Sequence, residues 1–211
     1  MIKIQLLIDN VNSWMLPYVK SYSNNLAKNG FSSKVLTKHE EVEKGDILIL
    51  LSCEKKFTKL SLNKNNLVIH ESDLPNGKGW SPLTYQVLEG KNKIPITLIE
   101  ADKNFDGGLI YLRDWIELNG DELVDELREK QAYKTFFLID KFLKERSSIK
   151  GERQLGKETF YERRNPSHSE LNIDKSILEN FNLLRVADNE RYPAYFVYKS
   201  QKYIIKVFKD G

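Results

Sequence analysis

One histidine stands where an α/β protein would place a catalytic side chain. His70 ends the apolar run 66–70, and a polar loop rich in glycine and proline follows it at once. In open α/β sheets, ligands bind beyond the carboxyl ends of the strands. An imidazole there can give and take protons near neutral pH, because its ordinary pKa is about 6.5. The alternative is a structural histidine whose ring is hydrogen-bonded to a nearby carbonyl group.

Few other residues in the sequence suit such chemistry. It contains three histidines, of which His39 lies in a charged loop and His168 lies between two serines. We expect His39 to be solvated and His168 to lie in a turn. The single cysteine, Cys53, has no histidine close in sequence to activate it, so we expect a small buried side chain rather than a nucleophile. This set of histidines and one cysteine predicts no metal site.

Strands and helices alternate around His70. Runs of aliphatic residues predict buried strands, and the spacing of apolar residues predicts the helices between them. The pattern favours an α/β fold with a mostly parallel, twisted sheet. The expected strands are 2–9, 33–37, 46–51, 66–70, 95–100 and 109–116, the last two being neighbours. The expected helices are one that begins at Ser13 and stops at 29–30, then 83–88 and 121–144.

A polar, glycine-containing stretch near residues 145–160 predicts a linker. We therefore place a main domain at 1–148 and a small C-terminal unit at 149–211. That unit is expected to contain a short helix near 175–184 and strands at 195–198 and 203–208, joined by a hairpin at 199–202. The exposed edge of this hairpin makes a homodimer one candidate assembly.

Composition narrows the partners of the chain. Its 211 residues include 33 Lys and Arg against 30 Asp and Glu, a formal net charge of +3. So small an excess gives no strong attraction for nucleic acid. No apolar run approaches the roughly 18–20 residues that span a bilayer, and the start lacks the layout of a signal peptide. One cysteine suits a reducing compartment, so we expect a cytoplasmic protein.

The loop after His70 carries a family resemblance. The segments HESDLPNGKGWSP (70–82) and FDGG (105–108) resemble the folate-dependent formyltransferases in both order and spacing. The resemblance covers residues 46–144 and is weak before residue 40. It implies a Rossmann-like formyltransferase fold that transfers a formyl group from N10-formyltetrahydrofolate, as co-substrate, to a primary amine without a metal.

The resemblance implies roles for particular residues. His70 would be the general acid and base, and Asp106 would orient it or hold a proton-relaying water. The family's asparagine should stand at position 68, where this chain has Val68. Asn66 lies too far back along the strand to replace it, unless a bulge shifts the register. Ser72 and backbone N–H groups are then candidates to stabilise the oxyanion, and a member that binds without turnover is an alternative.

The resemblance also places the two substrates. The folate is expected against two strand ends, held mainly by backbone groups. These residues are Leu51, Ser52, Cys53, Glu100, Ala101 and Asp102. The amine acceptor is expected near Trp80 and Tyr85, with Lys78 and Arg113 as candidates to meet a phosphate or carboxylate. The alternatives are a loop-anchoring role for Trp80 and simple solvent exposure for the two basic side chains.

A second resemblance concerns the acceptor. Segments 161–169, 183–186 and 192–194 resemble the tail of formyltransferases that act on nucleotide-linked amino sugars. Segments 8–14 and 70–80 further resemble a subgroup tied to bacterial pseudaminic-type glycan pathways, and also the formylating domains of some peptide synthetases. The alternative acceptor is an aminoacyl group on a tRNA or a carrier, which the short tail and small net charge disfavour.

Two adjacent arginines in the tail leave two interpretations open. Arg163 and Arg164 could clamp a pyrophosphate, because the guanidinium fork matches its oxygens. They could equally cap a helix or pair with Glu162 and Glu170.

Overall fold

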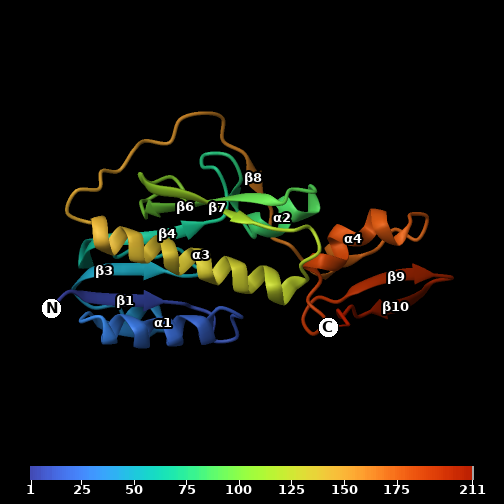
Figure 1. The fold of residues 1–211 in the computed structure, drawn as a ribbon, viewed down its shortest axis with the longest axis horizontal. Coiled ribbons are helices and arrows are strands. Elements are labelled where there is room, and N and C mark those ends of the chain that lie inside the picture. The colour runs from blue at the N-terminus through green and yellow to red at the C-terminus, as the bar shows by residue number, and fades with distance from the viewer. Residues whose placement is uncertain (211) are drawn as a thin grey trace.

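The computed structural model describes residues 1–210 and is built around one twisted sheet (Figure 1). The sheet has the strand order β2-β1-β3-β4-β6-β7. Its strands are β1 (Lys3–Leu7), β2 (Ser32–Leu36), β3 (Gly45–Leu50), β4 (Asn63–His70), β6 (Lys93–Glu100) and β7 (Ile110–Glu117). The first four run parallel, whereas β6 pairs antiparallel with both β4 and β7. The predicted mostly parallel α/β sheet is confirmed.

Helices cover the sheet, and a smaller unit follows them in the chain. The helices are α1 (Leu16–Lys28), α2 (Pro82–Leu88), α3 (Val124–Glu145) and α4 (Ile177–Val186). Short 3-10 turns occur at η1 (His39–Glu41), η2 (Leu60–Leu62) and η3 (Pro166–Ser169). The hairpin β9 (Ala194–Tyr198) and β10 (Gln201–Ile205) lies beside α4, away from the sheet in Figure 1. Within the described residues, no helix is long and apolar enough to cross a membrane.

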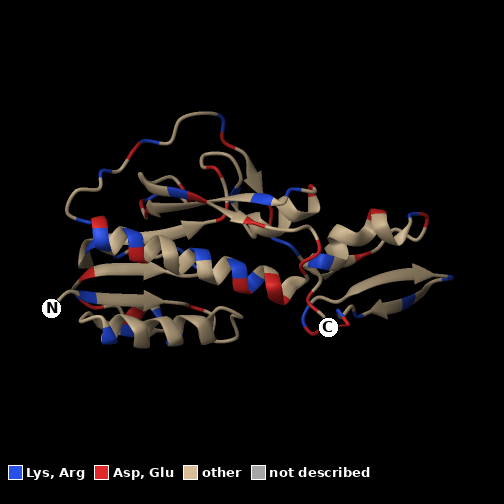
Figure 2. Ribbon diagram, in the orientation of Figure 1, with Lys and Arg blue, Asp and Glu red and all other residues tan. Residues whose placement is uncertain are grey.

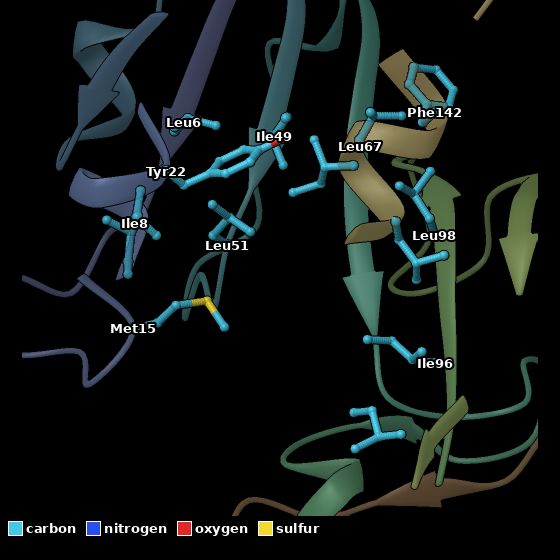
Figure 3. Packing of buried hydrophobic residues seen from close by; sticks show 14 of the residues in the cluster. Leu6, Ile8, Met15, Tyr22, Ile49, Leu51, Leu67, Ile96, Leu98 and Phe142 are labelled. Carbon is cyan, nitrogen blue, oxygen red and sulfur yellow. The ribbon is translucent and has the colours of Figure 1, made fainter. Parts of the chain in front are cut away.

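Both faces of the central strands are buried, which explains the unbroken aliphatic run of β3. On one face, α1 and α3 pack on the sheet, and Figure 3 shows Ile49, Leu67 and Leu98 from successive strands lying toward Phe142 of α3. On the other face, residues of β1 and β3 pack with Phe57 from the loop after β3. Alternate side chains of these strands therefore enter two separate apolar layers.

Charged side chains lie mainly outside the sheet. Figure 2 shows Lys and Arg interspersed with Asp and Glu along α3, whereas β1, β3 and β4 are largely free of them. One ion pair is buried: Arg185 of α4 is 1% exposed and donates to the Glu122 carboxylate at 3.2 Å. Lys130 of α3 also donates to Glu122, at 2.8 Å. Glu122 thereby joins α3 to the C-terminal unit.

Two local predictions were wrong. The helix predicted to begin at Ser13 begins at Leu16, and the Ser13 hydroxyl instead accepts the backbone N–H of Met15 in the preceding turn, at 3.3 Å. The connection between β9 and β10 is two residues long instead of four, because Lys199 and Ser200 both adopt positive φ (46° and 63°). Such turns match the strand twist, but they are usually marked by Asn-Gly, so Lys-Ser gave no signal.

The segment after α3 returns across the main domain. The backbone N–H of Glu152 donates to Ile110 of β7 at 2.8 Å, and Ile110 returns the same bond. Further on, β8 (Phe160–Tyr161) pairs in parallel with β5 (Lys78–Gly79) in the loop after His70. Residues 152–161 were mostly expected to be a linker and belong to the predicted C-terminal unit. They nevertheless form backbone hydrogen bonds with residues of the predicted main domain. The boundary at 148 stays a prediction.

Candidate active site

His70 ends β4 with both ring nitrogens near a polar atom. The side chain is buried, at 6% exposure, and Nε2 lies 2.8 Å from the carbonyl oxygen of Gly77. A carbonyl can only accept, so Nε2 carries a hydrogen in this arrangement. Nδ1 lies 3.7 Å from Asp106 Oδ1. Nδ1 is therefore the ring nitrogen that faces a carboxylate. The hydrogen bond from Nε2 to the Gly77 carbonyl is the structural role considered for this histidine. Nδ1 is left as the candidate atom for acid–base chemistry.

Asp106 is held in a strained loop from two directions. Its φ is +51°, a conformation that costs a non-glycine residue of the order of 1 kcal/mol and persists where the surroundings enforce it. The Oδ2 atom accepts the backbone N–H of Gly79 at 3.0 Å. The Gln154 carboxamide donates to the carbonyls of Asp106 and Gly108, at 2.7 and 2.9 Å. Sequence reasoning missed Gln154, which lies in the predicted linker.

The loop after His70 is shaped by the returning segment. Gly79 has φ +97°, and a Cβ there would lie 2.4 Å from the Tyr161 carbonyl oxygen, so only glycine fits beside β8. The Trp80 N–H donates to that carbonyl at 3.1 Å, and the Gly77 N–H donates to the Thr159 hydroxyl at 2.8 Å. The same loop presents the carbonyl to His70 and the N–H to Asp106. Residues 159–161 thus help to fix the relative positions of the two candidate catalytic side chains.

The register of β4 settles the position of Asn66. Val68 is paired with Leu50 on one side and Ile99 on the other, without a bulge in β4, while the irregularity lies between β6 and β7. The Asn66 side chain donates to the Leu60 carbonyl at 2.9 Å, away from His70. Val68 therefore occupies the place two residues before His70, and no carboxamide stands there.

Ser72 is buried in the loop that follows His70. It is 2% exposed, and its hydroxyl has no hydrogen-bond partner among the described residues. Its carbonyl accepts the Thr97 hydroxyl at 2.6 Å. A role in stabilising an oxyanion stays a prediction, and Ser72 is not among the residues that line the cavity with His70.

A cavity of about 810 Å³ opens at the end of β4. His70 and Asp106 line it, and so do all six residues expected around the folate: Leu51, Ser52, Cys53, Glu100, Ala101 and Asp102. We call the part between loops 50–57 and 99–106 the loop side. We call the part bounded by Glu71, residues 124–135 and 186–192 the helix side.

Asp9 fixes the first loop of the loop side. Its carboxylate accepts the backbone N–H groups of Glu54 at 2.7 Å and Lys55 at 2.9 Å. His39 Nε2 lies 3.0 Å from the same carboxylate, so the prediction that His39 is solvated was wrong. The ring also packs near Phe57. Burial, with the nearby charge of Asp9, raises the pKa of Cys53 to about 12, so the thiol stays protonated.

Trp80 lines the cavity beside an arginine pair. The Arg163 guanidinium lies 4.5 Å from the centre of the Trp80 ring and donates to Glu54 at 2.9 Å. Arg164 donates to the His168 carbonyl at 2.8 Å, its Nε is buried with no acceptor among the described residues, and burial lowers its pKa. Neither arginine pairs with Glu162 or Glu170, which was one of the interpretations left open by the sequence, and both line the cavity.

Three residues expected near the acceptor lie outside the cavity lining. Tyr85 stacks on Tyr161, with 4.7 Å between the ring centres. Lys78 is 4% exposed and pairs with Glu158 at 2.6 Å. Arg113, on β7, lies 3.7 Å from Asp73 and forms a second contact with Glu152. The structure brings together His70, Asp106 and Trp80, but not these three.

The sequence analysis did not identify the polar residues that line the helix side of the cavity. Glu71 follows His70 directly and lines the cavity, and burial raises its pKa against the opposing effects of the His70 ring and a hydrogen bond from Gln131. Thr135 of α3 also lines the cavity, and its buried hydroxyl has no partner in residues 1–210. Gln131 and Thr135 share one face of α3. Because their neighbours on that face are apolar, the sequence pattern did not identify these two as residues that line a cavity. Within the same residues, no group of three or more His, Cys, Asp or Glu could hold a metal.

The known sequences to which this chain is similar include formyltransferases that act on different acceptors. No family model matches the chain. It is 24% identical over 180 residues to a methionyl-tRNA formyltransferase of Mycoplasma mycoides, covering 81% of this chain and 56% of that protein. It is 26% identical over 134 residues to a GDP-perosamine N-formyltransferase of Brucella melitensis, covering 60% of this chain and 51% of that protein. The chain spans about half the length of these curated relatives.

Comparison with solved structures covers the whole chain. The methionyl-tRNA formyltransferase of Clostridium thermocellum superimposes with a TM-score of 0.81 at 22% identity, covering 100% of this chain and 95% of that one. HypX of Aquifex aeolicus, in complex with tetrahydrofolic acid, superimposes with a TM-score of 0.72 at 14% identity, covering 98% of this chain and 37% of that one. Together with the cavity at the end of β4, these likenesses show that the chain has the fold of the folate-dependent formyltransferases.

Proposed function

We propose that this chain transfers the formyl group of N10-formyltetrahydrofolate to the primary amine of a nucleotide-linked amino sugar. The observation that carries the proposal is the pair His70 and Asp106, 3.7 Å apart in a cavity of the formyltransferase fold. The GDP-perosamine N-formyltransferase of Brucella melitensis is a relative whose name specifies a nucleotide-linked sugar. Bacterial surface-glycan synthesis of the pseudaminic type, in the cytoplasm, is the setting that we infer from the sequence resemblance.

The loop side fits the flat, hydrogen-bonding heterocycle of a folate. Leu50, Phe57 and Val68 give it apolar walls. The first flanking loop is fixed by Asp9, and the second by Asp102 within it, whose carboxylate accepts the Asn104 N–H at 2.6 Å. The backbone N–H and C=O groups of these two loops therefore keep one arrangement. This suits a folate heterocycle that is held mainly by hydrogen bonds to the main chain.

The residues around His70 supply the proton transfers. When bound, N10-formyltetrahydrofolate supplies the formyl group. His70 Nδ1 accepts a proton from the attacking amine and returns it to N10 of the folate as the bond between N10 and the formyl carbon breaks and tetrahydrofolate leaves. Asp106 stabilises the imidazolium between the two proton transfers. Val68 offers no donor to the formyl oxygen, so the developing negative charge must be met by His70 and backbone N–H groups. Removing one such donor from an enzyme typically costs about 10²–10³ in rate, so we expect modest turnover.

The acceptor part of the proposal is supported by Trp80 and the adjacent arginines. An aromatic face suits a base or sugar, and two guanidinium groups suit a phosphate. The Arg164 Nε, buried without an acceptor among the described residues, is a donor such a ligand would satisfy. A second candidate acceptor is an aminoacyl-tRNA, because methionyl-tRNA formyltransferases are among the relatives. A third candidate function, folate binding without turnover, rests on Val68.

One incubation series separates these candidates. The purified chain is mixed with N10-formyltetrahydrofolate and, in turn, with nucleotide-linked amino sugars, the free amino sugars and charged initiator tRNA. Release of tetrahydrofolate and the mass gain of the acceptor are both followed. Formylation of a nucleotide-linked sugar, with less turnover on the free sugar, is the expected result. Turnover on charged tRNA alone would show that the acceptor is an aminoacyl-tRNA and not an amino sugar. Folate binding without turnover on any amine would refute the enzymatic proposal.

A further inference from the structure

Glu71 directly follows His70 and lines the same cavity, yet the proton transfers assigned to His70 and Asp106 make no use of it. Its side chain is 8% exposed, and its side-chain partner is Gln131 of α3. Within residues 1–210, no lysine or arginine forms an ion pair with its carboxylate. Burying a carboxylate without a counter-charge is costly, so this position suits a cationic group of a ligand.

A second buried group on the helix side also lacks a partner. Thr135 lies one helical turn after Gln131 on α3 and lines the cavity, and its hydroxyl has no hydrogen-bond partner among the described residues. A hydroxyl oxygen and a carboxylate both accept hydrogen bonds, and so does the free nitrogen of His70, Nδ1. The cavity is thus lined by three acceptors, which matches the three N–H donors of a primary ammonium ion.

The acceptor amine brings one proton more than His70 can pass on. Amino groups are mostly charged at neutral pH, because their ordinary pKa lies between about 8 and about 10. Converting an ammonium ion to a formamide releases two protons, and N10 of the leaving tetrahydrofolate takes one of them. His70 Nε2 is engaged by the Gly77 carbonyl, so the ring carries one proton at a time through Nδ1. The other proton needs a different acceptor.

The surroundings of Glu71 suit that task. Burial raises the pKa of its carboxyl above 4.5, and the charge of Asp106 acts in the same direction. The His70 ring and the hydrogen bond from Gln131 act against them. A carboxylate whose pKa is raised takes up a proton more readily than an exposed one, and a buried site favours the uncharged pair of amine and carboxylic acid over the charged pair.

We propose that Glu71 receives the primary amine of the acceptor as an ammonium ion, with the Thr135 hydroxyl as a second acceptor, and takes the proton that frees the nitrogen lone pair. The inference rests on the proposed function. One N–H bond of the ammonium ion breaks, its proton passes to the Glu71 carboxylate, and the lone pair forms the bond to the formyl carbon. The second proton leaves through His70 Nδ1 to N10. Glu71 gives its proton to water when the formamide departs.

The first test measures binding without turnover. Calorimetry in the presence of unreactive 5-formyltetrahydrofolate compares GDP-perosamine with GDP-rhamnose, and UDP-glucosamine with UDP-glucose, so that each pair differs in an amine against a hydroxyl. We expect the amine of at least one pair to bind about tenfold more tightly, since a hydrogen bond to a charged group contributes roughly that factor. Glu71→Gln keeps the size of the side chain and should lose the preference with folate affinity unchanged. Thr135→Val should weaken amine binding several-fold.

The second test follows the proton. The ratio of kcat/KM between the wild type and Glu71→Gln should fall as the pH rises from about 6.5 to about 9, because the variant depends on amine that is already uncharged in solution. His70 is common to both chains, so its titration cancels in the ratio. Asp73→Asn is the matched control, because Asp73 lies in the same loop, is exposed and does not line the cavity. It should keep the amine preference and the pH profile of the wild type.

The outcomes separate this inference from the function on which it rests. Equal or undetectable affinity for amine and hydroxyl in both pairs would overturn the role of Glu71, and so would a preference that survives in Glu71→Gln. Formyl transfer to an amino sugar in either case would leave the proposed function intact. An amine preference that depends on Glu71, without formyl transfer to any amine, would refute the proposed function itself.

Discussion

Acidification should unfold this protein partly through one carboxylate, Glu122. Although burial opposes its ionisation, hydrogen bonds from Lys130 and the backbone N–H groups of Asn119 and Gly120 lower the pKa of Glu122 from 4.5 to about 2. The Arg185 guanidinium, at 3.2 Å, also favours the charged form. At about 1.4 kcal/mol per pH unit, the difference corresponds to about 3 kcal/mol of unfolding free energy.

The sign follows from the direction of the pKa change. A carboxyl whose pKa is lowered on folding stabilises the folded state above its unfolded pKa, and loses that stabilisation as the pH falls through the folded value. The contribution of Glu122 is therefore complete above about pH 4.5 and is lost progressively down to about pH 2.

Glu122→Gln isolates this contribution. At pH 7 the variant should lose about 3 kcal/mol or more, because Arg185 remains buried without its counter-charge. Urea denaturation followed by circular dichroism, repeated from pH 7 to pH 2.5, gives the unfolding free energy of both chains. The difference between them should shrink by about 2.5 kcal/mol between pH 7 and pH 2.5. Glu129→Gln, an exposed position on α3, is the control, and its unfolding free energy should follow that of the wild type at every pH. A constant difference between Glu122→Gln and the wild type across this range would refute the reasoning.

Three further outcomes test the site. His70→Asn should abolish formyl transfer and Asp106→Asn should reduce kcat by at least about 10²-fold with folate affinity retained, as single-turnover kinetics and calorimetry would show, whereas near-normal turnover in both would contradict the assignment. Gln154→Ala should lower kcat about tenfold by releasing the Asp106 loop, and an unchanged kcat would mean that the loop holds itself. Thr135→Val removes a buried hydroxyl that has no partner within residues 1–210, so thermal unfolding should show equal or higher stability by up to about 1 kcal/mol, and a clear loss would reveal a hidden partner.

Local patterns were enough to predict the sheet and the end of β4. The apolar runs of β3 and β4 and the polar loop after them placed His70 correctly, because strand burial and turn chemistry are encoded by near neighbours. The family resemblance added Asp106. Lys78 was predicted to meet a phosphate or carboxylate of the acceptor. In the structure it pairs with Glu158, which is remote in sequence, so no local pattern reveals the pair.

Contacts made by the returning segment could not be predicted in the same way. The pairing of β5 with β8 involves two residues on each side, which is too short for any periodicity to appear. Gln154 acts through two loop carbonyls, and the side-chain partner of Glu71 is Gln131 of α3, which is remote in sequence. The roles of such residues depend on contacts between segments that are remote in sequence, so only the folded structure identifies them.

The same closure determines where this protein can be divided. Residues 149–161 have the composition of a spacer, the kind of stretch at which domains are usually separated, fused or permuted. Here they supply the backbone edge against which the His70 loop is shaped, and the carboxamide that holds Asp106. A fragment ended at residue 148 would keep every strand of the main sheet but lose the groups that align its two candidate catalytic residues. A fragment intended for engineering should therefore extend at least through Tyr161.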